Sequence, residues 1–324
     1  MGSPMRVRYS ARTDTGKRRE INQDAYGSAE IGQGTLLIVC DGMGGHLAGE
    51  VASKLAVESI IAAFQPGEDP AEGLRQAFVV ANQRVHAEGR GSMGTTAVAV
   101  FFWHNTLYVA NVGDSRAYLV REGQIRQLTH DHSLIGDQVA AGLLTAEEAR
   151  ASNIRNIITR AIGHLSHVEV DLFREPLLPG DTIVLSTDGM HGLLTDEEIA
   201  AIASMHPLDV AARRLVDEAN ARGGPDNITV VIAQVDGLDP TISESVTVVA
   251  APPPPPAVAA PPTVKPLSRV GLALATLVLV VLIGLGVFVT ATDQRTPPPL
   301  LSSPTIAATA TPISTVTPLP TATP

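Results

Sequence analysis

Residues 36–46 read LLIVCDGMGGH, an apolar run that passes directly into an Asp-Gly pair at Asp41. Similar carboxylates recur far downstream, at Asp188 after one strand-like run and at Asp226 before another. A carboxylate at the end of a strand is held rigidly and stays open to solvent, as a hard divalent cation requires of its ligands. Any one Asp-Gly pair is more simply a turn, but three such carboxylates together indicate a metal site.

The distribution of charge argues against one class of partner. The 324 residues carry a formal net charge of −10, and beyond residue 250 the only charged side chains are those of Lys265, Arg269, Asp293 and Arg295. The acidity therefore belongs to the first part of the chain. Nucleic-acid binding relies on clustered Lys and Arg, so we expect no nucleic-acid partner.

The cysteine content indicates a reducing compartment. Cys40 is the single cysteine, so the chain has neither an internal disulfide nor a thiol framework for zinc. Residues 1–9 lack the apolar core of a signal peptide.

Residues 5–237 alternate strand-like and helix-like patterns and form the expected globular domain. Strand candidates are short and rich in Val, Ile, Leu, Thr and Tyr, at 35–40, 95–103, 106–112, 116–121, 168–174, 181–186 and 228–235. Apolar residues at helical spacing predict helices at 48–64, 70–88 and 207–222. A capping Thr before Glu predicts two shorter helices, starting at Thr145 and Thr195. Because hairpin-linked strands lie between the long helices, we expect antiparallel sheet covered by helices.

The composition changes after residue 237. Residues 238–269 are Pro-rich and predict a stiff, extended linker. Residues 270–289 carry no charge and, at about 1.5 Å per residue, are long enough to cross a bilayer core of roughly 30 Å. This segment lies between two Pro-rich stretches and has no domain to be buried in, so a transmembrane helix is favoured over a core helix.

The charges beside this segment predict its orientation. Lys265 and Arg269 lie just before it, whereas Asp293 and Arg295 cancel after it. The positive-inside rule then places the large domain in the cytoplasm, attached to the cell membrane by a single span. Residues 290–324, dominated by Thr, Pro, Ala and Ser, predict a disordered tail outside the cell.

A series of short motifs runs through residues 5–236. In order, these are T-D-x-G from Thr13, R-x-x-N-Q-D from Arg19, D-G-M-G-G-H-x-x-G-E-x-A-S from Asp41, M-G-T-T from Met93, A-N-V-G-D-S-R-A-Y from Ala110, L-T-x-D-H-S from Leu128, R-A-I-G from Arg160, S-T-D-G from Ser186 and G-G-P-D-N-I-T from Gly223. In these motifs, their order and their spacing, the chain resembles bacterial members of the metal-dependent protein phosphatases, type 2C. One motif alone is a weak signal, whereas all of them together are highly specific.

The resemblance implies a fold, an activity and partners. The expected fold is α+β, a four-layer α-β-β-α sandwich of two antiparallel sheets flanked by helices, here followed by the one transmembrane helix. The implied reaction is hydrolysis of phosphoserine and phosphothreonine in proteins by a water that two Mn²⁺ or Mg²⁺ ions activate. Serine/threonine kinases are the implied substrates, because a membrane tether raises the local concentration of the domain near other membrane proteins.

The resemblance also implies the metal ligands. Asp41 would bridge the two ions, and the Gly42 carbonyl would ligate one of them, since glycine lets the backbone approach an ion closely. Asp188 would hold one ion and Asp226 the other, with water in most of the remaining positions.

Further site residues follow from the same resemblance. Asp24 would contact a metal-bound water, and Asp114 would help to bind a weaker third ion. The alternative is that Asp114 is a hairpin turn residue that Ser115 and Arg116 merely brace, but we expect it to be a site residue. Arg19 would grip two phosphate oxygens with its planar guanidinium, as Lys could not.

The general acid is not assigned by register. Distant family members carry a histidine directly after the Asp-Gly pair, where this chain has Met43, so His46 cannot inherit that role. A cysteine-based phosphatase is excluded, because an arginine would have to stand six residues after Cys40, where His46 lies. A phosphate-binding loop of the NTPase type is excluded as well, because Glu50 replaces its lysine.

Two further expectations complete the sequence-based hypothesis. Residues 131–156 resemble the variable flap of bacterial relatives and would influence substrate choice. The alternative function is a non-catalytic, phosphoprotein-binding pseudophosphatase. Such a module should have lost metal ligands, whereas Asp41, Asp188 and Asp226 are all present.

Overall fold

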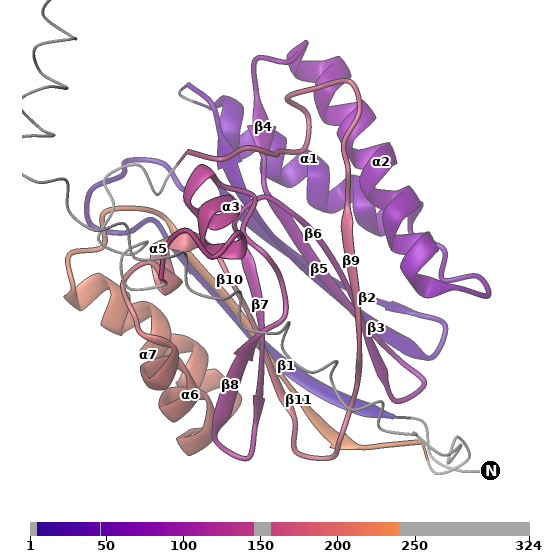
Figure 1. Cartoon of the computed structure of the whole chain (residues 1–324), viewed down its shortest axis with the longest axis vertical. Helices are drawn as coiled ribbons and strands as arrows, with labels where there is room; N and C mark the ends of the chain where they lie inside the picture. Colours follow the sequence, from indigo (N-terminus) through magenta and orange to yellow (C-terminus); the bar gives the residue numbers. More distant parts are fainter. Residues whose placement is uncertain (1–4, 46, 146–156, 240–324) are drawn as a thin grey trace, which may run out of the picture. The chain divides into compact units, whose positions relative to one another are not determined.

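The computed structural model describes residues 5–45, 47–145 and 157–239. Their strands form two antiparallel sheets, and helices lie outside each sheet (Figure 1). Across the first sheet the strands are β1 (Arg6–Asp14), β11 (Ile228–Gly237), β10 (Thr182–Ser186), β7 (Arg116–Arg121) and β8 (Gln124–Gln127). Across the second sheet they are β2 (Asp24–Ile31), β3 (Gly34–Met43), β5 (Ala97–Trp103), β6 (Thr106–Val112) and β9 (Asp171–Pro176), with the short β4 (Gly94–Thr95) paired to the end of β3.

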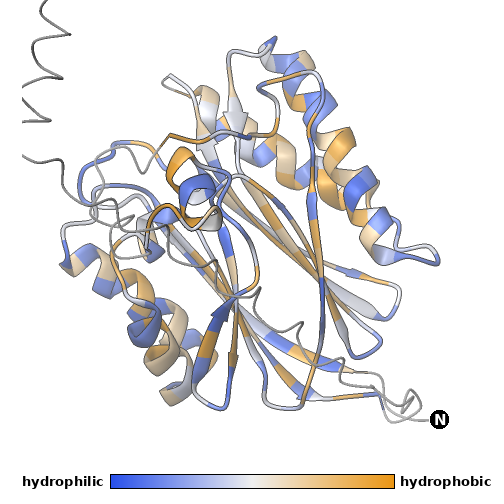
Figure 2. Cartoon of the chain, viewed as in Figure 1, coloured by the Kyte–Doolittle hydropathy of each residue, from blue (hydrophilic) through white to orange (hydrophobic). Residues whose placement is uncertain are grey.

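Three hydrophobic clusters separate four layers. Helices α1 (Ala48–Ala63) and α2 (Pro70–Gly89) pack against one face of the second sheet. Helices α6 (Asp196–Met205) and α7 (Leu208–Ala221) pack in the same way against the first sheet. The third cluster lies between the two sheets. Figure 2 shows hydrophobic residues along the strands of both sheets and along the helices that cover them. The predicted α-β-β-α sandwich is confirmed for the described residues.

Strand β3 shows why its sequence is an unbroken apolar run. Successive side chains of a strand point to opposite faces. Leu36 and Ile38 accordingly join the cluster beneath α1 and α2, whereas Leu37 and Val39 join the cluster between the sheets. All four are fully buried. The part of β3 that is covered on both faces therefore leads directly into Asp41.

The polar strands differ from the sequence prediction. Strands β1 and β2 were not expected, because each stands at the edge of its sheet and mixes exposed with partly buried residues. Strand β8 is also an edge strand, and β9 begins three residues later than predicted. Helix α6 begins as predicted, with Thr195 and Glu198 forming a reciprocal capping box.

Several sequence predictions fall outside the structure's coverage. The helix predicted from Thr145 would run into 146–156, and the linker from residue 240, the membrane span 270–289 and the tail 290–324 also lie outside the described residues. Among the residues that are described, no helix is both long and apolar enough to span a bilayer. Two shorter helices, α3 (Leu134–Ala140) and α5 (Asp188–His191), follow β8 and β10 along the chain.

Candidate metal centre

Four of the predicted aspartates lie together. Asp24 and Asp41 are direct cross-strand partners on β2 and β3. Asp188 opens α5 just after β10, and Asp226 stands just before β11, the strand that pairs with β10. Both of these aspartates act electrostatically on Asp24 and on Asp41. Positions as far apart in the sequence as Asp24 and Asp226 therefore form one acidic cluster.

The glycines of the two Asp-Gly pairs are required by close backbone contacts. A Cβ atom on Gly42 would lie 2.0 Å from the carbonyl oxygen of Gly49. A Cβ atom on Gly189 would lie 1.9 Å from the carbonyl oxygen of Asn227. No side chain fits at either distance, so these glycines permit tight packing beside each carboxylate.

The backbone of Asp41 is fixed by two threonines. Its N–H donates to Oγ1 of Thr96 at 2.9 Å, and its carbonyl accepts from the N–H of Thr96 at 2.8 Å. The hydroxyl of Thr95 donates to the same carbonyl at 2.8 Å. The expected bridging carboxylate thus projects from a rigid position, as a metal ligand should.

Asp24 is buried and only half satisfied. Its Oδ2 accepts hydrogen bonds from the hydroxyls of Thr187 at 2.9 Å and Thr229 at 2.7 Å. Its Oδ1 is buried and has no hydrogen-bond partner among the described residues. The motifs alone assign no role to these threonines, although each stands one residue before or three residues after a predicted ligand. An unsatisfied buried carboxylate oxygen favours a cation or a cation-bound water nearby.

Burial and mutual repulsion disfavour the ionised forms of the clustered aspartates. Burial first, and repulsion from Asp188 and Asp226 second, raise the pKa of Asp24 to about 7. Burial and repulsion from Asp24, Asp188, Asp114 and Asp226 hold the pKa of Asp41 well above its usual range. Such a group of acids is stabilised by bound cations.

The donor set fits Mn²⁺ or Mg²⁺ with part of the coordination left to water. Within residues 5–45, 47–145 and 157–239, no three His, Cys, Asp or Glu side chains already lie close enough to hold an ion together. Both ions accept carboxylate and carbonyl oxygens together with several waters. The chemistry of the residues therefore matches the predicted metals, whereas their roles as individual ligands stay predictions.

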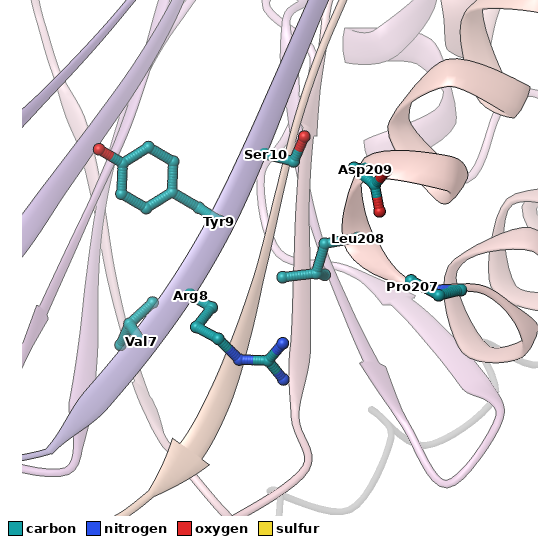
Figure 3. Close-up of a pocket in the computed structure, with 7 residues that line it drawn as sticks. All are labelled: Val7, Arg8, Tyr9, Ser10, Pro207, Leu208 and Asp209. Carbon is teal, nitrogen blue, oxygen red and sulfur yellow. The ribbon is translucent and has the colours of Figure 1, made fainter.

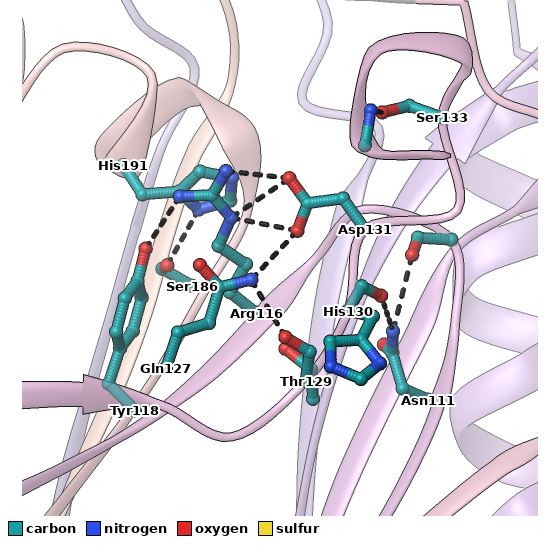
Figure 4. A network of polar contacts seen from close by, with 12 residues as sticks. Asn111, Arg116, Tyr118, Gln127, Thr129, His130, Asp131, Ser133, Ser186 and His191 are labelled. Carbon is teal, nitrogen blue, oxygen red and sulfur yellow. Dashed lines mark hydrogen bonds and ion pairs between the residues drawn. The ribbon is translucent and has the colours of Figure 1, made fainter. Parts of the chain in front are cut away.

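Asp114 belongs to the same acidic region. It is buried in the loop between β6 and β7, and burial, together with Asp188 and Asp131, raises its pKa to about 8. Arg116 places its guanidinium fork on Asp131, at 2.8 Å and 2.6 Å, and also bonds to the hydroxyl of Tyr118 at 2.9 Å (Figure 4). Arg116 is thus paired with Asp131, and Asp188 acts electrostatically on Asp114, whose role as a ligand of a third ion stays a prediction.

Arg19 reaches the cluster from the loop between β1 and β2. Its Nη2 donates to Oδ2 of Asp226 at 2.7 Å, and its side chain is 49% exposed. A guanidinium that contacts a predicted ligand and still faces solvent can meet an anionic group that approaches the cluster. The contact of Arg19 with phosphate stays a prediction.

Asn227 holds the Arg19 loop and was not predicted. Its Oδ1 accepts from the N–H of Gln23 at 2.8 Å, and its Nδ2 donates to the carbonyls of Thr15 and Ile21 at 2.9 Å and 3.0 Å. The signal in the sequence is an amide side chain directly after a predicted ligand. Asn227 therefore positions Arg19 through the backbone on both sides of it.

A separate hollow lies away from these carboxylates. It has a volume of about 400 Å³ and lies between β1 and the start of α7, where Arg8, Tyr9 and Leu208 are among its lining residues (Figure 3). None of the predicted site residues lines it. The hollow is therefore separate from the predicted metal centre. His46 lies outside the described residues.

Comparison with known proteins agrees with this geometry. The model of the family "Protein phosphatase 2C" matches residues 20–135. The serine/threonine phosphatase stp of Listeria monocytogenes is 37% identical over 238 residues, which cover 69% of this chain and 94% of that protein.

Two solved structures extend the similarity. The Mycobacterium tuberculosis serine/threonine phosphatase PstP/Ppp is 35% identical, with a TM-score of 0.67 over 71% of this chain and 99% of that one. The catalytic domain of PstP in complex with two manganese ions is also 35% identical, with a TM-score of 0.64 and the same coverage. Together with the four-layer fold and the acidic cluster, these similarities show that the chain belongs to the protein phosphatase 2C family.

Proposed function

We propose that this protein is a metal-dependent phosphatase that hydrolyses phosphoserine and phosphothreonine in proteins. The observation that carries the proposal is the convergence of Asp24, Asp41, Asp188 and Asp226 with the exposed guanidinium of Arg19. Relatives named as serine/threonine phosphatases support this substrate class. An acidic cluster with one outward-facing arginine suits a phosphate monoester that is bound together with divalent cations.

Each residue has a defined task in this proposal. Asp41, fixed by its two threonines, would hold both ions, and the carbonyl of Gly42 would hold one of them, while Asp188 and Asp226 would each hold one. When bound, Mn²⁺ or Mg²⁺ lowers the pKa of water and neutralises phosphate oxygens. Asp24, oriented by Thr187 and Thr229, would accept a proton or a hydrogen bond from water at the edge of the cluster.

Arg19 would orient the phosphate. Its guanidinium already bonds to a carboxylate oxygen of Asp226, and a planar fork of donors suits phosphate oxygens equally well. Asn227 keeps the loop in place while the Arg19 side chain exchanges one anionic partner for the other.

The activity is tested with the purified full chain and a phosphothreonine peptide. We expect hydrolysis with Mn²⁺, and loss of hydrolysis both with a chelator and in Asp188→Asn. Asp209→Asn, an exposed aspartate on α7 outside the cluster, is the matched control and should hydrolyse at the wild-type rate. Equal rates in the wild type, the chelated sample and Asp188→Asn would exclude metal-dependent catalysis and leave a phosphoprotein-binding module.

We further propose that residues 270–289 tether the enzyme to the membrane, with the catalytic domain in the cytoplasm and serine/threonine kinases among its substrates. The apolar segment and the positive charges before it support this topology. Protease added outside intact cells should remove only the tail. Loss of the catalytic domain in that experiment would contradict the orientation.

A further inference from the structure

The turn that carries Asp114 is held by the buried His132, which bonds to both backbone groups of Gly113. The backbone N–H of Gly113 donates to Nδ1 of His132 at 3.1 Å. The backbone N–H of His132 in turn donates to the carbonyl of Gly113 at 3.0 Å. Two reciprocal bonds therefore fix the residue directly before Asp114.

These bonds define the tautomer of His132. Because Nδ1 accepts a hydrogen bond, the proton of the neutral ring is on Nε2, which lies 3.1 Å from Oδ2 of Asp171 and 3.2 Å from Nη1 of Arg160. A guanidinium only donates, so Asp171 is the acceptor for the Nε2 proton. Arg160 donates to the other carboxylate oxygen of Asp171 at 2.6 Å. Burial lowers the pKa of His132. Asp171 and Arg160 thus orient the ring whose opposite nitrogen receives Gly113.

The turn has little freedom on its other sides. Gly113 has a φ of +102°, and a Cβ atom there would lie 2.6 Å from Cγ2 of Thr96. On the far side of Asp114, the hydroxyl of Ser115 lies 2.7 Å from Oγ1 of Thr96. This same Oγ1 accepts from the N–H of Asp41. A shift of Gly113 would therefore displace Asp114 and, through Ser115 and Thr96, also disturb the position of Asp41.

The carbonyl of Gly113 has a second support. Nδ2 of Asn111 donates to this carbonyl at 3.2 Å and to the carbonyl of His130 at 2.9 Å (Figure 4). Asn111 therefore holds the carbonyl of the turn, while the N–H of Gly113 depends on His132. Replacement of the ring removes one identifiable bond from an otherwise braced turn.

We propose that His132 is a positioning residue for Asp114, acting as a neutral Nε2–H imidazole that fixes Gly113 and so sets the affinity of Asp114 for a divalent cation. The proposal rests on the proposed function only in taking Asp114 to be a cation ligand. Residues behind a ligand commonly change metal affinity by about 10–100-fold when they are replaced.

The tautomer is measured first, on the wild-type full chain labelled with ¹⁵N-histidine and loaded with Mg²⁺. The resonances of His132 are those missing from the spectrum of His132→Asn. We expect an unprotonated Nδ1 and a protonated Nε2. A protonated Nδ1, or an average of the two tautomers, would overturn the proposal.

The effect on metal affinity is then measured by calorimetric titration with Mn²⁺. Loss of a weak binding event in Asp114→Asn identifies the Asp114 site. In His132→Gln, which has no acceptor at the Nδ1 position, we expect the affinity of that site to fall about tenfold. His132→Asn places an amide oxygen near the Nδ1 position, so its affinity should lie between those of the wild type and His132→Gln.

The matched control is His130→Asn, at an exposed histidine two residues away, which should bind Mn²⁺ as the wild type does. Equal losses in His132→Asn and His132→Gln, no loss in either, or no binding event removed by Asp114→Asn would each overturn the proposal. Neither measurement uses a phosphopeptide. An absence of phosphatase activity would therefore leave this inference intact, and failure of this inference would leave the phosphatase assay unaffected.

Discussion

Asp41→Asn is expected to abolish Mn²⁺-dependent hydrolysis of the phosphothreonine peptide, with a fall in kcat on the order of a thousandfold or more. Asp41 follows the fully buried run of β3 and is fixed by Thr95 and Thr96. An amide of the same shape keeps these backbone contacts but removes the negative charge that would be shared between two cations. The rate is measured at saturating Mn²⁺, so that a simple loss of metal affinity is separated from a loss of catalysis.

The same substitution should stabilise the metal-free protein at neutral pH. The folded-state pKa of Asp41 is well above its ordinary value, that of Asp24 is about 7, and that of Asp114 is about 8, against 3.8 for an ordinary aspartate. Between about pH 4 and pH 8 the folded state therefore binds more protons than the unfolded state, so stability without metal falls as the pH rises through this window. Asn carries no ionisable group at this position, so the variant avoids the cost of placing the Asp41 carboxyl, ionised in the unfolded state, in the buried acidic cluster. In urea with a chelator, the unfolding midpoint of Asp41→Asn should exceed that of the wild type at pH 7.5 and approach it near pH 4.

The rate and the urea midpoint together distinguish loss of catalysis from loss of folding in Asp41→Asn. A variant that is inactive because it fails to fold would have a lower urea midpoint at every pH. A variant that retains wild-type activity would remove Asp41 from the centre. Asp209→Asn, at an exposed position, should change neither the rate nor the midpoint.

The sequence predicts the centre of this fold better than its edges, for a physical reason. Strands β3 and β10 are covered on both faces, so their side chains form apolar runs that are readily recognised. The carboxylates that stand at the ends of such runs are found together with them. Strands β1 and β2 are edge strands with mixed exposure, and their pairing depends on partners that no local pattern specifies.

The supporting contacts of the site were not predictable in the same way. Thr187 and Thr229 are strand-forming residues, and nothing local distinguishes a threonine that bonds to Asp24 from one that merely suits a strand. Asn227 reaches Gln23 across more than two hundred residues. His132 joins Gly113 to Asp171 only because β6 and β9 are neighbours. Predicted ligands can be recognised in short sequence motifs. The groups that orient them come from distant parts of the chain and are brought together only by the topology of the fold.

Arg19→Ala is expected to lower kcat/KM for the phosphothreonine peptide by about ten- to a hundredfold. Charge-assisted hydrogen bonds are worth about 1.5–3 kcal/mol, which corresponds to this range. Arg19→Lys should recover only part of the loss, because an ammonium group lacks the planar pair of donors. Arg18→Ala, at an exposed position next in the sequence, is the matched control and should leave kcat/KM unchanged.

The bond between Arg19 and Asp226 allows a competing explanation to be tested in the same samples. If Arg19 served only to hold Asp226 in place, Arg19→Ala would weaken Mn²⁺ binding, and extra Mn²⁺ would restore the rate. If Arg19 binds phosphate, its removal frees a carboxylate oxygen of Asp226, so Mn²⁺ affinity should be unchanged or higher while KM for the peptide rises. A rate restored by Mn²⁺, or equal losses in Arg18→Ala and Arg19→Ala, would contradict the phosphate contact. Weaker peptide binding without weaker Mn²⁺ binding therefore identifies phosphate, rather than Asp226, as the anion that the guanidinium of Arg19 binds during turnover.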